Sequence, residues 1–306
     1  MGRPPGSVPS YPNLIVGIVL GRPGTDPGGT GVRLLTSVRH RGHKAGYLGA
    51  DRGYTQALPE HFHLPVRALG YFVVMDYKAA ALGLQANSSG AVMVDGAFYC
   101  PAMPEALVSA SADHRCGLID EATRAARVTA RAPFRLVRKQ GPDHDGYERL
   151  CCPALGDHPK LCCPLRPSEN GIGKIPVLFP PASPPKLCSQ TAVTIAPDVG
   201  ARFRQELAFG SEEWARTYAA YRNTIEGLNG FMKDTAHEAL AAPDRRRVRG
   251  IAAQSLFCGI LAMAANIRKI AAHRALVADG LAPMVAERAR RRRMSITDYR
   301  PPPPAG

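Results

Sequence analysis

The chain has 306 residues, of which 45% are hydrophobic and 21% are charged, so it can bury a substantial core and global disorder is excluded. Lysine and arginine number 39 against 25 acidic residues, a net charge of +14 that favours a polyanionic partner, most often nucleic acid. We see no uninterrupted apolar run near the roughly 20 residues that a membrane span requires, so we expect a soluble protein with no membrane partner.

Residues 12–80 alternate between strand and helix patterns. Residues 14–20 form a continuous apolar run of the buried-strand type, and a loop rich in glycine and proline follows. A short basic helix is predicted next, because its apolar residues recur at helical spacing. Two further strands are predicted at 45–50 and 71–75, and Asp51 directly follows the first of them. This alternation of strands and helices predicts an α/β fold.

Residues 81–200 have a different composition, with frequent prolines and seven of the eight cysteines. Short apolar runs predict a β-rich region here, with strands at 91–94, 134–137 and 177–179. The dipeptide formed by Asp95 and Gly96 predicts a tight turn.

The cysteines of this region leave two alternatives open. The adjacent pairs Cys151–Cys152 and Cys162–Cys163, with His158 between them, could contribute to a structural Zn²⁺ site. Because the cysteines are adjacent and do not have the usual two-residue spacing, reduced thiols within the β-rich region are the other interpretation.

Residues 201–278 are helical in pattern, with long helices predicted at 204–233 and 249–275. The second helix is apolar nearly all round, which predicts that it is buried against a sheet. Residues 279–306 contain a run of arginines and a run of prolines and are expected to form a basic, disordered tail. From residue 245 onward the chain holds 13 basic and 3 acidic side chains, which again favours DNA as partner.

Two places carry the strongest candidates for chemistry. Asp51 stands at the end of a predicted buried strand, where α/β sheets bind ligands and where a carboxylate can hold a divalent metal. The alternative is an aspartate that caps the following helix. Further along, Arg222, Glu226 and Lys233 share one face of a predicted helix. A surface ion pair is the alternative interpretation of that arginine and glutamate.

Together these residues resemble a known signature. Arg222-x3-Glu226-x6-Lys233 resembles the tyrosine–arginine–glutamate–lysine motif of DDE transposases from bacterial insertion sequences. Asp51, within Gly-Ala-Asp-Arg-Gly-Tyr, resembles the second aspartate of their catalytic triad. The separation of 175 residues (226 − 51) matches the subgroup with a β-rich insertion before the glutamate.

The resemblance covers most of residues 12–275 and implies how the chain is organised. It implies an RNase H-like catalytic domain made of residues 12–80 and 201–278, with residues 81–200 as the β-rich insertion.

The implied function is that of a transposase, which cleaves and transfers DNA strands at transposon ends. Asp51 and Glu226 would be catalytic and would hold two Mg²⁺ or Mn²⁺ ions. The expected partners are transposon-end and target DNA together with a second copy of the chain as a homodimer, and the expected location is the cytoplasm, associated with the nucleoid. DNA would be bound by Tyr218, Tyr221, Arg222, Lys233, Arg245, Arg246, Arg247 and Arg249.

The sequence departs from the family pattern at two places. Ala219 stands where the motif has its tyrosine, with Tyr218 and Tyr221 on either side. The first catalytic aspartate belongs on a strand upstream of the one that leads to Asp51, and no aspartate precedes Asp26. We therefore expect an N-terminally truncated copy, or a misplaced start, with impaired catalysis. The alternatives are a catalytically inactive DNA-binding remnant and an unrelated α/β protein with a basic tail.

Overall fold

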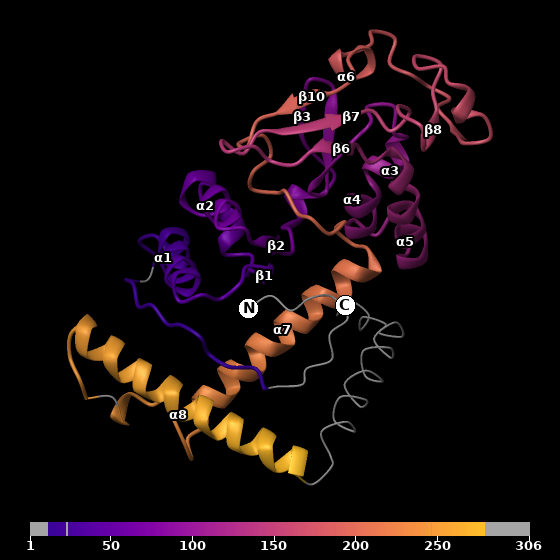
Figure 1. Ribbon diagram of the computed structural model, residues 1–306. Coiled ribbons are helices and arrows are strands. Elements are labelled where there is room, and N and C mark those ends of the chain that lie inside the picture. The colour runs from indigo at the N-terminus through magenta and orange to yellow at the C-terminus, as the bar shows by residue number, and fades with distance from the viewer. Residues whose placement is uncertain (1–11, 23, 246, 279–306) are drawn as a thin grey trace.

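A computed structural model describes residues 12–22, 24–245 and 247–278 and has a mixed α/β fold with four small sheets in that part of the chain (Figure 1). The α/β class predicted from the sequence is confirmed at this level. The predicted disordered tail, residues 279–306, lies outside the described residues. Figure 1 shows the β-rich region at one end of the molecule, helix α8 at the other, and helix α7 between them.

Helix α1 (Pro27–His40) is the short basic helix that the sequence predicts. Asp26 caps it by accepting a hydrogen bond from the Gly29 N–H at 2.9 Å, and Pro27 occupies the first position, which needs no N–H donor. Arg39 and His40 lie in the last turn, where positive charge complements the helix dipole. The helix begins inside the predicted glycine-rich loop because this cap outweighs the turn-forming residues.

Strands β1 (Tyr47–Gly49) and β2 (Phe72–Val74) form a parallel pair with Tyr47 opposite Phe72 and Gly49 opposite Val74. Both strands are predicted from the sequence. The connection between them contains the 3-10 helices η1 (Tyr54–Gln56) and η2 (Pro59–His61) and helix α2 (His63–Ala68), and η3 (Ala79–Ala81) follows β2. Because the two strands are parallel, their carboxyl ends lie at the same edge of the sheet.

The β-rich region lies between residues 84 and 195. One antiparallel sheet has the order β3-β4-β5, a second has the order β10-β7-β6, and β8 pairs parallel with β9. Their bounds are Leu84–Ser88 (β3), Ala91–Val94 (β4), Ala97–Tyr99 (β5), Val137–Gln140 (β6), Glu148–Cys151 (β7), Leu161–Cys162 (β8), Ile175–Pro176 (β9) and Val193–Ile195 (β10). Of the predicted strands, 91–94 is confirmed as β4, 134–137 overlaps β6 only at Val137, and 177–179 is wrong because β9 ends at Pro176.

Short helices in this region are not foreseen by the sequence. They are α3 (Glu105–Val108), α4 (Ala110–Arg115), α5 (Glu121–Ala130), α6 (Lys186–Ser189) and the 3-10 helices η4 (Ala132–Phe134) and η5 (Glu169–Gly171). The predicted tight turn is confirmed: Asp95 and Gly96 join β4 to β5 with φ values of 46° and 89°. Two successive positive φ angles suit a two-residue hairpin, because they match the twist of the strands.

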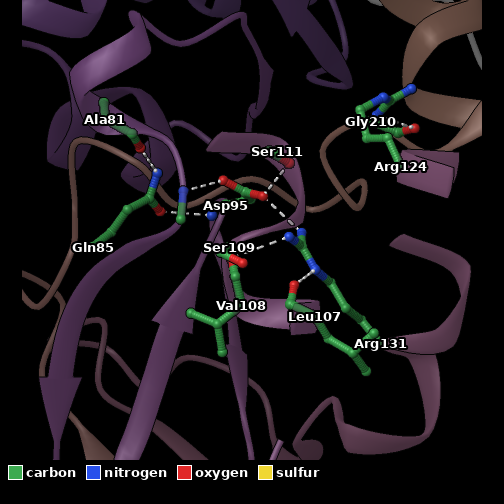
Figure 2. A network of polar contacts seen from close by, with 12 residues as sticks. Ala81, Gln85, Asp95, Leu107, Val108, Ser109, Ser111, Arg124, Arg131 and Gly210 are labelled. Atoms are coloured by element: carbon green, nitrogen blue, oxygen red, sulfur yellow. Dashed lines mark hydrogen bonds and ion pairs between the residues drawn. The ribbon is translucent and has the colours of Figure 1, made fainter. Parts of the chain in front are cut away.

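Asp95 also anchors the helices to this sheet (Figure 2). Its carboxylate accepts hydrogen bonds from the Gly83 N–H at 2.8 Å, the Ser111 hydroxyl at 2.5 Å and the Arg131 guanidinium at 2.7 Å. Arg131 also donates to the Leu107 carbonyl at 2.7 Å. Asp95 and Arg131 are each 2% exposed, so this is a buried ion pair, and each side-chain nitrogen of Arg131 and each carboxylate oxygen of Asp95 has a hydrogen-bond partner.

Two long helices complete the fold. Helix α7 (Glu212–Lys233) is capped by Ser211, whose hydroxyl accepts a hydrogen bond from the Trp214 N–H at 3.2 Å. The helix packs on β1 and β2. After a turn of 3-10 helix η6 (Pro243–Arg245), helix α8 (Ile251–Ala278) crosses the C-terminal part of α7 (Figure 1).

The prediction that α8 is buried against a sheet is wrong. Its large apolar side chains are mostly exposed, and its buried residues are the smaller Cys258, Ala262 and Ala265. Within the part of the chain that the structure describes, α8 is the one helix long and apolar enough to cross a membrane by length and composition, and a single helix of this kind is weak evidence for a span.

The predicted strand at residues 14–20 is also wrong, because this segment has no regular structure. It contacts α7 and α8 at its start and then packs against α1, where Gly17 lies next to Leu34 and Val38. The Asn266 side chain accepts from the Ile15 N–H at 2.9 Å and donates to the Ile15 carbonyl at 2.7 Å. Asn13 donates to the Thr224 hydroxyl of α7 at 3.4 Å. A strand needs backbone partners on a neighbouring strand, and here a helix side chain takes that role at Ile15.

Candidate active site

The carboxyl ends of β1 and β2 bring two aspartates to one edge. Asp51 follows β1 by two residues and Asp76 follows β2 by two residues, and the Ala50 N–H donates to the Val74 carbonyl at 3.1 Å, which keeps the two chain segments together. This edge is where α/β sheets bind ligands. Asp51 is predicted from the sequence, whereas Asp76 is not. The signal was present, because Asp76 also follows directly on an apolar strand.

Arg52 lies between the two carboxylates. Its backbone N–H donates to Asp51 Oδ1 at 2.6 Å, and its guanidinium Nε lies 3.1 Å from Asp76 Oδ2. Asp51 is exposed, whereas the Asp76 side chain is 24% exposed. The guanidinium therefore neutralises the more buried of the two carboxylates in this arrangement.

Helix α7 lies directly on β1 at Gly49. A Cβ added to Gly49 would lie 2.7 Å from the Tyr221 Cβ, so only glycine allows this approach. The Tyr221 ring is 8% exposed and belongs to the core between the helix and β2, together with Val74 and Leu207. Tyr221, predicted to bind DNA, is thus a packing residue in its described position.

Tyr218 connects α7 to the aspartate edge. Its ring stacks on Trp214, with centroids 5.0 Å apart and an angle of 8° between the planes. Burial raises the pKa of the Tyr218 hydroxyl, and the nearby Asp76 carboxylate adds to this effect, while the charges of Arg222 and Arg52 oppose it. Asp76 and Arg52 at the strand edge and Arg222 on the next turn of α7 therefore all lie near Tyr218.

Gln205 fixes the edge of β2 beside this group. Its side-chain carbonyl accepts from the Met75 N–H at 3.0 Å, and its amide donates to the Met75 carbonyl at 2.8 Å. The same carbonyl accepts from the Trp214 indole N–H at 3.1 Å. One glutamine thus ties the strand end to the helix that carries Tyr218.

Glu226 lies one turn beyond Arg222 on the exposed side of α7. Arg222 Nε donates to Glu226 Oε1 at 2.8 Å, and this hydrogen bond raises the pKa of the Arg222 guanidinium. The two side chains are 56% and 60% exposed. The contacts of Glu226 and of Asp51 are both local, the first within α7 and the second with the neighbouring Arg52. In this conformation Arg222 and Glu226 therefore form a surface ion pair, which is the alternative interpretation given above.

The predicted basic residues at the C-terminal end of α7 and in the turn that follows are exposed where the structure describes them. Lys233, Arg247 and Arg249 are exposed, as is Arg245, whose guanidinium donates to the Thr235 carbonyl at 3.0 Å. Arg246 lies outside the described residues. Two further cations, Arg268 and Lys269, lie over the Phe231 ring at 4.1 Å and 4.3 Å from its centroid, and Arg268 is among the cations expected from the sequence to extend the DNA-binding track.

Among the described residues between 12 and 278, no group of three or more His, Cys, Asp or Glu side chains is placed to hold an ion. The eight cysteines are free thiols, and five of them are buried: Cys100, Cys152, Cys163, Cys188 and Cys258. The Cys100 thiol and Cys152 form a hydrogen bond that lowers the pKa of Cys152 to about 7 and raises that of Cys100. A structural Zn²⁺ site stays a prediction.

No family model, curated protein or solved structure matches this chain. The relation to DDE transposases therefore stays a prediction from the residues.

Proposed function

We propose that the chain is a DNA-processing enzyme of the DDE transposase type, whose reaction is metal-dependent cleavage and transfer of DNA strands at transposon ends. One observation carries the proposal: Asp51 and Asp76 share the edge of a parallel strand pair beneath a helix that bears Tyr218, Arg222 and Glu226. An RNase H-like domain interrupted by a β-rich insertion is part of the same proposal. Its support is the parallel pair β1–β2 covered by α7, with the antiparallel sheets intervening in the chain.

The donor set of this edge suits Mg²⁺ or Mn²⁺, because both ions prefer carboxylate oxygen. Asp51, Asp76 and Glu226 would be the residues that hold them, after a rearrangement, because in the described conformation they do not form a group placed to hold an ion. When bound, the ions would supply charge stabilisation for an in-line displacement at phosphorus. Arg52 must release Asp76 before that carboxylate can serve, and its side chain, 47% exposed, has room in solvent to turn away.

The cations of α7 and of the following turn would hold the DNA backbone. Arg222 has five N–H donors, of which its bond to Glu226 uses the one at Nε, and it also forms a hydrogen bond with Tyr218. Lys233, Arg247 and Arg249 extend the exposed positive surface toward α8. Contacts of this kind position a duplex without reading its sequence. Tyr218 is half-buried and adjoins Asp76, so it is better placed than the buried Tyr221 to meet a phosphate near the carboxylates.

The test is nicking of supercoiled DNA with Mg²⁺ or Mn²⁺ by the purified chain. Asp51→Asn, Asp76→Asn and Glu226→Gln each remove a carboxylate charge with little change of shape, and each should reduce the nicking rate by roughly a hundredfold or more. Asp157→Asn is the matched control, because Asp157 is an exposed carboxylate in the β-rich region. If all three edge variants keep the nicking rate of the control, the catalytic proposal is wrong.

A second candidate function, a DNA-binding protein without catalysis, is favoured by the Arg52–Asp76 ion pair. A carboxylate that stays neutralised in this way contributes little to holding a cation. This candidate predicts DNA binding that weakens with salt and no Mn²⁺-dependent nicking. In either case the double variant Arg247→Ala, Arg249→Ala should reduce the slope of log affinity against log salt by about 2, if both side chains contact phosphates.

A further inference from the structure

Helix α8 carries a continuous apolar stripe on the side that faces away from the rest of the molecule. Its large side chains are between 36% and 69% exposed. They are Leu256, Ile260, Met263, Ile267, Ile270 and Val277, and Arg274 occupies the one remaining position of the stripe. We call these seven residues the α8 seam.

The spacing of the seam is that of a coiled coil. Its members follow one another at alternating intervals of four and three residues from 256 to 277, which places every one of them at an a or d position of a heptad repeat. A helix that only covers a globular core usually has a broader apolar face. A strict alternation over three heptads is the pattern that packs against another helix.

The opposite face of α8 already has its partners. Cys258, Ala262 and Ala265 are buried, Asn266 binds Ile15, and Arg268 pairs with Glu238. These contacts fix the rotation of the helix about its axis. The α8 seam therefore faces solvent on a helix whose orientation is fixed, at the far end of the molecule from the β-rich region (Figure 1).

We propose that the α8 seam pairs in antiparallel orientation with the same seam of a second copy of this chain. From the exposed fractions, the seam offers on the order of 600 Å² of apolar surface per copy, so a symmetric pair buries about 1,200 Å², the lower end of a specific protein interface. A self-complementary patch on each copy is what a two-fold dimer requires. This inference does not depend on the proposed DNA chemistry.

Charge selects the antiparallel orientation. α8 has no acidic residue, and its cations Arg268, Lys269 and Arg274 all lie in its C-terminal half. A parallel pair would place Arg274 of one copy against Arg274 of the other at the seam, which is unfavourable. An antiparallel pair sets Arg274 beside Leu256 of the other copy, where its aliphatic stem covers the leucine and its guanidinium reaches water. Met263 then lies opposite Ile267 at the centre.

A lipid bilayer is a poorer occupant for the same helix. Insertion would carry the Arg268 and Lys269 charges into the hydrocarbon, at a cost of a few kcal/mol each. It would also break the two Asn266–Ile15 hydrogen bonds and the Arg268–Glu238 pair.

Sedimentation equilibrium of the full chain tests the proposal. The wild type should be dimeric at micromolar concentration. Ile267→Lys places an ammonium at the centre of the seam in both copies, and because Ile267 is 67% exposed in one copy, the fold of the single chain should not suffer. We expect the dimer dissociation constant to rise by at least roughly a hundredfold. Ala275→Lys adds the same charge at an exposed position of α8 outside the seam and should leave the dimer intact.

The orientation has its own test. Met263→Glu alone should also dissociate the dimer, whereas the double variant Met263→Glu, Ile267→Lys should restore it, because only the antiparallel pair brings the two introduced charges of different copies together. A monomeric wild type, or a dimer that persists in Ile267→Lys, would overturn the proposal. Dissociation of both single variants without rescue would overturn the antiparallel arrangement. Sedimentation of a monomeric wild type with vesicles of phosphatidylcholine and phosphatidylserine would assign the seam to a membrane instead.

Discussion

Replacing Gly49 by alanine tests the close packing of α7 on the strand that leads to Asp51. The added Cβ would lie 2.7 Å from the Tyr221 Cβ and 2.9 Å from its Cδ2. Carbon atoms in contact are normally about 3.5–4.0 Å apart, so helix and strand must separate by roughly 1 Å. Overpacking of this kind costs about 1–3 kcal/mol, and we expect urea denaturation to give a free energy of unfolding lower by about 2 kcal/mol.

The same displacement of α7 should reduce the rate of DNA cleavage more than the affinity for DNA. α7 carries Tyr218 and Arg222 toward Asp76, and a shift of about 1 Å in reacting groups can cost roughly a hundredfold in rate. We expect Mn²⁺-dependent nicking by Gly49→Ala to fall by about that factor while DNA affinity is retained.

Gly53→Ala is the control for this change. A Cβ there meets nothing within 4 Å, and its φ of −55° suits any residue. Equal urea midpoints for Gly49→Ala, Gly53→Ala and the wild type would refute the reasoning, because they would mean that α7 is not held against β1 at this distance.

For three further substitutions the structure determines the direction of the change in the free energy of unfolding. Burial, and then the charge of Arg67, lowers the pKa of His63 to about 4. The neutral imidazole is therefore favoured in the folded state, and the free energy of unfolding should fall by up to about 3 kcal/mol as the pH drops from 6.5 toward 4. His63→Phe should remove this pH dependence, as measured by urea denaturation between those pH values. Asp95→Asn leaves the Arg131 guanidinium buried without a counter-charge and should destabilise the chain by about 3–5 kcal/mol in urea, and a loss below 1 kcal/mol would contradict a buried pair. Gly227→Ala, in the interior of α7 with nothing within 4 Å of the new Cβ, should raise the unfolding free energy by up to about 1 kcal/mol, and a decrease would mean that α7 is not helical there.

The strands that lead to the candidate site could be predicted because their signals are local. The apolar runs at 45–50 and 71–75 each end in a short polar segment, and the structure has β1 and β2 within them. Residues 14–20 have the same apolar character and are not a strand. Strand formation depends on a neighbour that offers backbone partners, and sequence periodicity does not reveal whether that neighbour exists.

The grouping around Asp76 could not be predicted because it depends on contacts between distant parts of the chain. Arg52 pairs with Asp76 across the sheet edge, and Tyr218 lies near Asp76 on α7. The sequence did identify Arg222 and Glu226 as neighbours on one helix face, since that relation follows from helical geometry alone. The apolar pattern of α8 was recognised in the sequence. Such a pattern indicates that the helix packs against another apolar surface, but it does not show whether that surface belongs to the same molecule.

The Gln205 side chain has a consequence for the order in which the chain folds during synthesis. It completes the hydrogen bonding at Met75 from 130 residues away, and Phe209 and Trp214 close the apolar cluster over the same strands. The core of the β-rich region, in contrast, draws its residues from a continuous stretch between Ala86 and Phe203. A growing chain therefore holds everything that the β-rich core needs before Gln205 has been added. We expect that core to form first on the ribosome, and the edge that bears Asp51 and Asp76 to be among the last parts of the protein to take shape.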